Sequence, residues 1–318
     1  MAFELDPLSP VVNLNFGMSL RGLGRFDEAM SLFETAVQSD PDFPGAYERI
    51  GELNRYVYGR FDEAVVWQRK GVALDPDEPM GSLFLGFIYL DLGDADEAER
   101  WFTRMRKIVP SGFFLADAVL EPLHIFRGEE AAALDVARKT LEFEPGAPYS
   151  LAHIRTHELE AGRYAEARAL YEQAYPDLLN DAEPIIHGGN YEAAVDLALV
   201  LIKTGEQERA DALLERSLAH MRTEPRLGVA GYGIRDVLAY TLQGNKKKAL
   251  DALRQAIDLG WRTSWWFYLE HDANLESIRD EPEFQAMVEE IKADMAAQLE
   301  RVRTMEANGE LAAIPQID

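Results

Sequence analysis

The 318-residue sequence contains no cysteine and has few basic side chains for its number of acidic ones. Without cysteine, neither disulfides nor thiolate metal sites can form. Lysine and arginine together number 32, against 56 aspartate and glutamate residues, and the formal net charge is −24 at pH 7. Because binding to nucleic acid depends on a basic surface, this balance disfavours nucleic acid as a direct partner and favours a basic or apolar one.

Long apolar runs and targeting signals are missing too. No stretch of about 18 apolar residues is present, so we expect no membrane insertion by this chain as given. The first residues do not have the pattern of a signal peptide. We therefore expect a cytoplasmic protein, with a periplasmic location as the alternative if the chain is part of a membrane-anchored regulator.

A six-residue phrase, Gly-Arg-Phe-Asp-Glu-Ala, occurs twice without change, at residues 24–29 and 59–64. Looser copies of this phrase occupy residues 93–98, 162–167, 205–210 and 244–249. Glycine can adopt the positive φ that ends a helix, and the acidic residues that follow favour the first turn of the next helix. Each phrase therefore predicts a tight turn between two helices.

The spacing of the phrases is regular. Consecutive alanines are 35, 34, 35 and 34 residues apart at Ala29, Ala64, Ala98, Ala133 and Ala167. The same interval separates several prolines and glycines, namely Pro41, Pro76, Pro110 and Pro145, and Gly17, Gly51 and Gly86. A constant period of this length predicts stacked copies of one helical hairpin.

The content of each hairpin resembles the tetratricopeptide repeat, a unit of about 34 residues. The third copy has the family's pattern in Leu85-Gly86, Tyr89, Gly93, Ala98, Phe102 and Pro110. The resemblance implies an all-α fold, a right-handed superhelix of about seven helical hairpins closed by a C-terminal capping helix.

The repeats divide the chain into four expected segments. Residues 1–175 form the main array, with a truncated first hairpin and then five repeats; 176–190 interrupt it; 191–260 form two further hairpins; 261–318 form an aromatic segment and the capping helix. Residues 5–7 align with the end of a second helix two repeats later. We therefore expect that the chain is a fragment or remnant of a longer protein.

The C-terminal part is aromatic and then amphipathic. Five aromatic residues fall within eight positions, at Trp261, Trp265, Trp266, Phe267 and Tyr268. A helix is predicted from Pro282 until Asn308, with the aromatic segment packed beneath it. Residues 260–284 resemble the end of the repeat region in bacterial signalling proteins that carry a winged-helix DNA-binding or adenylyl cyclase domain. This chain has neither domain, so the resemblance implies a signalling context rather than an activity.

The sequence shows little sign of a metal site or a catalytic site. His153 and His157 lie four residues apart on a predicted helix and could share a metal ion. However, Ile154 occupies the position where a zinc-protease helix has glutamate, so packing or groove-lining histidines are favoured. Carboxylates are abundant, but none is paired with a nucleophile and base in a recognisable spacing. We therefore expect no catalysis and no cofactor.

Binding is the better expectation, because the first helix of each hairpin should line a concave groove. The positions facing that groove give the candidate partner-binding residues Leu14, Met18, Arg21, Glu48, Glu52, Arg55, Leu83, Phe87 and Thr156. Chaperone-binding members of the family clamp a terminal carboxylate with Lys and Asn at two of these positions; here the corresponding pairs are Leu14/Met18, Glu48/Glu52 and Leu83/Phe87. That ligand class is disfavoured. A groove that is apolar with acidic edges instead suits a segment with apolar anchors and some Lys or Arg. Met18, Leu83 and Phe87 can alternatively pack inside the superhelix.

These observations favour a non-catalytic protein-interaction scaffold, the sensor or docking part of a bacterial signalling protein. The alternative is self-association into a homo-oligomer, through the unpaired N-terminal face and Trp265/Trp266. A third hypothesis is metal or small-molecule sensing at His153 and His157.

Overall fold

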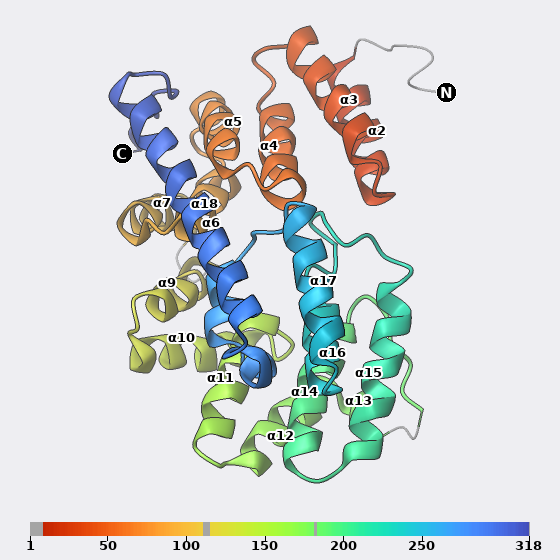
Figure 1. Cartoon of the computed structure of the whole chain (residues 1–318). Helices are drawn as coiled ribbons and strands as arrows, with labels where there is room; N and C mark the ends of the chain where they lie inside the picture. The colour runs from red at the N-terminus through yellow and green to blue at the C-terminus, as the bar shows by residue number, and fades with distance from the viewer. Residues whose placement is uncertain (1–8, 111–114, 181–182, 318) are drawn as a thin grey trace.

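The computed structural model describes residues 9–110, 115–180 and 183–317, and these residues form helices and no strands (Figure 1). Seven helical hairpins follow one another. Their helices are α2 (Pro10–Gly22) and α3 (Phe26–Ser39); α4 (Pro44–Leu53) and α5 (Phe61–Leu74); α6 (Pro79–Leu92) and α7 (Ala95–Ile108); α9 (Leu120–Phe126) and α10 (Glu130–Phe143); α11 (Pro148–Glu160) and α12 (Tyr164–Ala174); α14 (Tyr191–Lys203) and α15 (Gln207–Met221); and α16 (Arg235–Leu242) and α17 (Lys246–Asp258). The predicted all-α fold is confirmed. The expected truncated hairpin begins in residues 1–8, which lie outside the described residues.

The repeated glycines act as the sequence predicted. Gly93 has a φ of 91° and ends α6, and the side chain of Asp94 then caps α7 by accepting a hydrogen bond from the backbone N–H of Glu97 at 3.1 Å. A second glycine serves packing. A Cβ on Gly86 would lie 2.3 Å from a ring carbon of Phe102, so the aromatic ring of the second helix requires glycine on the first.

The second hairpin contains one more residue than its neighbours, and the structure shows where that residue goes. Directly after α4 the chain forms a π-helical turn, η1 (Asn54–Tyr58), which ends at Gly59 with a φ of 65°. A π turn adds one residue to a helix without breaking it. The chain has another such turn, η2 (Phe267–His271), in the aromatic segment.

Two parts of the array are irregular. In the fourth hairpin the first helix is split into α8 (Leu115–Ala118) and α9, and Leu120 occupies the position that is glycine in the earlier repeats. The stretch 176–190 begins with a short helix, α13 (Pro176–Asn180), and residues 183–190 contain no helix.

The predicted C-terminal helix is present as α18 (Pro282–Ala307), but it covers more than the last hairpin. It contacts α17 and also packs on α5 and α6, and Figure 1 shows it running along one side of the superhelix. Its buried Gln298 accepts hydrogen bonds from the N–H groups of Phe61 (2.6 Å) and Asp62 (3.2 Å) and donates one to the carbonyl of Gly59 (2.9 Å). The C-terminal helix therefore ties the end of the chain to the second hairpin.

Close backbone contacts join the second hairpin to the later part of the chain, along a line that we call the seam. A Cβ on Gly59 would lie only 2.6 Å from the carbonyl oxygen of Gly260, so the end of η1 lies against the end of the seventh hairpin. The N–H of Gly228 also donates a hydrogen bond to the carbonyl of Tyr56 at 3.0 Å. The superhelix thus closes on itself. None of its described helices is long and apolar enough to cross a membrane.

Buried polar contacts hold the aromatic segment inside the superhelix. Asp91 of α6 accepts a hydrogen bond from the N–H of Ser264 through its carboxylate, and its carbonyl accepts one from the indole of Trp265, both at 2.9 Å. Farther along, Arg155 of α11 has no exposed surface and forms ion pairs with Asp196 and with Asp272, the N-cap of η3 (Ala273–Ile278). The segment after the repeats therefore fills much of the groove that the repeats create.

Candidate functional site

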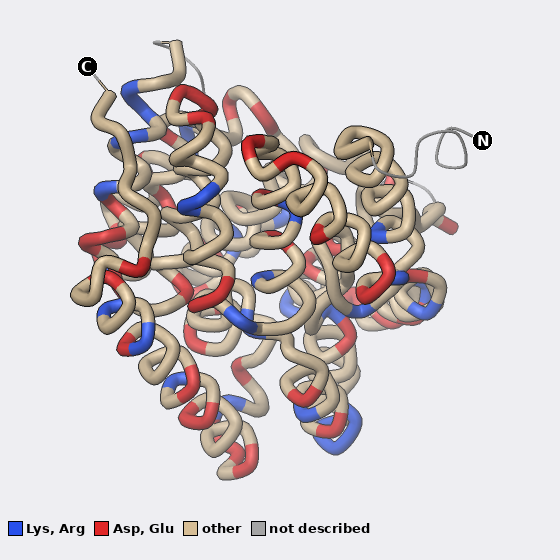
Figure 2. Tube along the Cα trace, turned by 90° about the horizontal axis from the view of Figure 1, so that it is seen from above, with Lys and Arg blue, Asp and Glu red and all other residues tan. Residues whose placement is uncertain are grey.

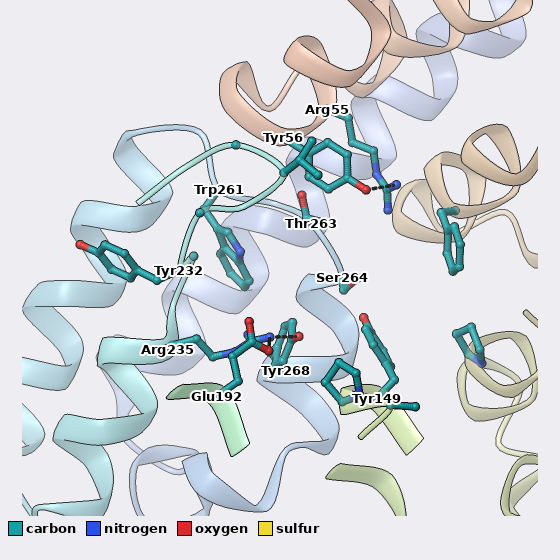
Figure 3. Close-up of a pocket in the computed structure, with 18 of the residues that line it drawn as sticks. Arg55, Tyr56, Tyr149, Glu192, Tyr232, Arg235, Trp261, Thr263, Ser264 and Tyr268 are labelled. Carbon is teal, nitrogen blue, oxygen red and sulfur yellow. Dashed lines mark hydrogen bonds and ion pairs between the residues drawn. The ribbon is translucent and has the colours of Figure 1, made fainter. Parts of the chain in front are cut away.

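A cavity of about 440 Å³ remains where the aromatic segment meets the inner helices. Its walls come from distant parts of the chain: η1, α6, α9, the C-terminal end of α10, the start of α11, the loop before α16, and residues 261–268. Figure 3 shows Arg55 and Tyr56 on one side of this space, Arg235 with Glu192 and Tyr268 on the other, and Trp261 between them. Both π-helical turns contribute lining residues. The closure of the superhelix is therefore what assembles the pocket.

Three arginines of the lining lie over tyrosine rings, an arrangement favoured by attraction between a cation and a π-system. The distances from guanidinium carbon to ring centroid are 4.8 Å for Arg55 over Tyr56, 4.8 Å for Arg226 over Tyr232, and 4.3 Å for Arg235 over Tyr268. Each arginine also has a carboxylate partner: Arg55 pairs with Asp91 at 2.8 Å, Arg226 with Asp236 at 2.6 Å, and Arg235 with Glu192 at 2.7 Å.

The ion pairs shape the titration of these groups. Burial raises the pKa of Asp91, and the attraction of Arg55 only partly offsets this effect. For Glu192 burial acts in the same direction, but the charge and hydrogen bond of Arg235 outweigh it and lower the pKa. The Tyr268 hydroxyl, which accepts a hydrogen bond from Arg235 at 2.5 Å, has its pKa raised by burial. In the pocket, therefore, a carboxylate balances the charge of each of the three arginines, and burial keeps the tyrosine hydroxyls protonated.

The predicted groove residues fall into two groups. Arg55, Leu83 and Phe87 line the pocket together. The others do not reach it. Leu14 and Met18 are half-buried against the core of the first two hairpins, and the hydroxyl of Thr156 donates to the carbonyl of Ala152, one turn earlier in α11.

The two predicted glutamates are engaged within the chain. Glu52 is 4% exposed and forms ion pairs with both Arg21 and Arg49, while Glu48 is half-buried beside Arg49. The Arg21–Glu52 pair joins the first and second hairpins, whereas the pairs of Arg49 lie within α4. Arg21 and Glu52 are thus paired within the chain, and their contact with a partner stays a prediction. The reason for the pairing is that groove positions of adjacent repeats are close enough to pair with one another.

The tryptophans that the self-association hypothesis required at the surface are buried. Trp265 is 6% exposed and Trp266 2%, and the Trp266 ring packs edge-on against Phe126 at 5.2 Å between ring centroids. They belong to the interior of the closed superhelix, and this part of the hypothesis is wrong for the closed chain.

His153 and His157 both lie near Glu130, and His153 also contacts Glu121 at 3.1 Å through Nδ1. Among the described residues, no group of three or more His, Asp or Glu side chains is arranged to hold a metal ion.

Sequence reasoning missed most of the pocket. Tyr149, Glu192 and Arg235 carried no motif, and only two signals pointed to the site: the extra residue of the second hairpin and the dense aromatic segment. Neither signal says that the two features meet, because they are about 200 residues apart.

The comparisons with known proteins agree with the fold. Three tetratricopeptide-repeat family models match the chain, at residues 14–79, 79–104 and 158–228. The chain is therefore a tetratricopeptide-repeat protein, and repeats of this kind support a protein-interaction scaffold. A comparison of the sequence with curated proteins gives no match.

Solved structures of similar fold are distant in sequence. The APC/C hetero-tetramer Cut9-Hcn1 has a TM-score of 0.53 at 18% identity, over 80% of this chain and 44% of that one. Yeast Tom70 has a TM-score of 0.52 at 14% identity, over 95% of this chain and 60% of that one. The human IFIT1 dimer with m7Gppp-AAAA has a TM-score of 0.53 at 14% identity, over 94% of this chain and 72% of that one. At these identities the likeness shows the α-solenoid fold alone.

Proposed function

We propose that the protein is a non-catalytic interaction scaffold that captures a partner segment, and that the pocket between η1, α11 and the aromatic segment is its recognition site. The observation that carries the proposal is the pocket itself. The protein's own C-terminal segment fills much of the groove, yet an aromatic-lined space is left open. Sites for ligands are typically concave and mostly apolar, with a few polar groups.

The partner we propose is a protein segment with an apolar anchor and neighbouring Lys or Arg. The net charge of −24 favours such a partner over an acidic one, and Figure 2 shows acidic positions spread over the helices among fewer basic ones. We expect the affinity for a basic segment to fall with added salt. A charge reversal at Glu52 does not test this idea, because it would break the ion pair with Arg21 between the first two hairpins and the pair with Arg49 within α4.

The experiment is a selection of random peptides displayed on phage against the purified chain. A Thr263→Trp variant, designed to fill the pocket, serves as the counter-target, and Thr223→Trp in an exposed position is the matched control. We expect the enriched peptides to bind the wild type and Thr223→Trp equally, and Thr263→Trp at least tenfold more weakly. Circular dichroism checks that both variants are folded. Peptides that bind all three proteins equally would place the site elsewhere.

We place this scaffold in a bacterial signalling or regulatory protein, on the strength of the resemblance of residues 260–284. Self-association through the N-terminal face is the second candidate function, and light scattering over a concentration series separates the two, because a monomer at high concentration excludes it.

A further inference from the structure

We propose that the pocket selects an aromatic side chain, held against the arginine–tyrosine stacks, from a segment that carries a Lys or Arg beside that aromatic residue. This inference rests on the proposed function and names the chemistry of its ligand. Two features carry it: the repeated stacking of arginine on tyrosine in the lining, and the distribution of charge between the interior and the rim of the pocket.

The stacks provide flat walls, and arginine stacks well on aromatic rings. Arg55 already lies over two rings, with its guanidinium carbon 4.8 Å from the centroid of Tyr56 and 5.6 Å from that of Phe87. Arg235 covers Tyr268 at 4.3 Å, and its other face is the one that we propose a ligand ring covers. Arg55 and Arg235 line opposite sides of the space, with the indole of Trp261 between them (Figure 3). Planar groups on both sides favour a planar ligand over a branched aliphatic one.

The charges exclude a strongly anionic ligand. Each of the three guanidinium groups is already paired, as Arg55–Asp91, Arg226–Asp236 and Arg235–Glu192. The lining adds two more carboxylates, Glu121 and Glu144. Three carboxylates therefore line the pocket, at Glu121, Glu144 and Glu192, and Asp91 and Asp236 balance Arg55 and Arg226 from behind the lining. A phosphate would find no unpaired arginine in the lining. A neutral aromatic ring fits this interior better than a nucleotide does.

The rim supplies a place for a cation. Glu144 is exposed at the C-terminal end of α10, and no Lys, Arg or His of the described residues forms an ion pair with its carboxylate. A helix C-terminus carries partial negative charge, which also attracts a cation. Glu121, by contrast, is buried and accepts a hydrogen bond from the hydroxyl of Ser150. Glu144 is therefore the group that would meet the ligand's Lys or Arg.

Small amides test this choice on the full-length chain. The probes are N-acetyl-phenylalaninamide, N-acetyl-leucinamide, N-acetyl-lysyl-phenylalaninamide and adenosine monophosphate, with dissociation constants measured by ligand-observed NMR. We expect the phenylalanine amide to bind about threefold or more tightly than the leucine amide, as a cation–π contact at a partly exposed site would give. We expect the lysyl probe to bind more tightly again.

Two variants assign the effect to residues. Arg235→Lys retains the positive charge that pairs with Glu192 but removes the planar guanidinium group. The dissociation constants of the phenylalanine and leucine amides should then become nearly equal. Glu144→Gln should remove the advantage of the lysyl probe, whereas Glu142→Gln, exposed on the same helix but outside the pocket, should keep it. Thermal melts verify that each variant folds.

The outcomes separate this inference from the proposed function. Equal binding of the phenylalanine and leucine amides, or tighter binding of adenosine monophosphate, overturns the inference while selected peptides still support the scaffold. No binding by any amide, together with selected peptides that depend on the pocket, also overturns the inference alone. If neither amides nor peptides use the pocket, both proposals fail.

Discussion

The contact between Gln298 and the second hairpin allows a sharp prediction. Gln298 is 3% exposed, and it serves the N–H of Phe61, which has no exposed surface, and the carbonyl of Gly59. Replacing it by alanine leaves both backbone groups without a partner. A buried polar group left unsatisfied costs about 1–3 kcal/mol, so with two such groups we expect Gln298→Ala to make the closing of α18 onto α5 less favourable by about 2–6 kcal/mol.

Amide hydrogen exchange is the assay, because it reports local opening that a global unfolding curve can miss. A loss of about 2–6 kcal/mol should speed exchange of the amides of Phe61 and Asp62 by about 30- to 30,000-fold. The control is Gln285→Ala, which makes the same change at an exposed position of the same helix and should leave these amides unaffected. A change of less than about threefold in Gln298→Ala would refute the claim that this side chain holds the closure.

Two further predictions follow from packing and titration. Gly86→Ala should lower the free energy of unfolding by about 1–3 kcal/mol, since its methyl group would collide with the Phe102 ring. In urea titrations, adding Phe102→Leu should partly restore the stability. An unfolding midpoint of Gly86→Ala equal to that of the unchanged chain would contradict this packing. Burial lowers the pKa of His153, but the hydrogen bond and charge of Glu121 outweigh it and raise the pKa above its ordinary value of about 6.5. The stability that His153 contributes is therefore complete below about pH 6.5 and is lost as pH rises through the raised pKa. NMR titration should show the raised value, and Glu121→Gln should lower it; a wild-type pKa at or below about 6.5 would contradict this account.

The sequence predicted what depends on local pattern. The repeated Gly-Arg-Phe-Asp-Glu-Ala phrase placed the turns, because positive φ and helix capping depend on neighbouring residues. The spacing of Gly86 and Phe102 likewise follows from one hairpin. The start of the terminal helix at Pro282 was predicted from its own residues and agrees with α18.

The closure of the superhelix by its C-terminal part could not be predicted from the sequence. The bond between Phe61 and Gln298 joins residues 237 positions apart, and nothing in either neighbourhood indicates the other. The same holds for Arg155 with Asp272. The groove positions were judged one repeat at a time, so the pairing of Arg21 with Glu52 in the next repeat was missed. The pocket depends on these long-range contacts and was therefore beyond local reasoning.

The distance between α5 and α17 tests most directly the claim that the chain's own C-terminal part closes the groove. The natural sequence has no cysteine, so spin labels can be placed at Glu63→Cys and Asp258→Cys alone, two exposed positions that line the same cleft at the seam. Pulsed electron paramagnetic resonance should give one short, narrow distance distribution, which broadens when Gln298→Ala is added. A long or broad distribution in the otherwise unchanged chain would mean that the superhelix is open, and would contradict the closed pocket.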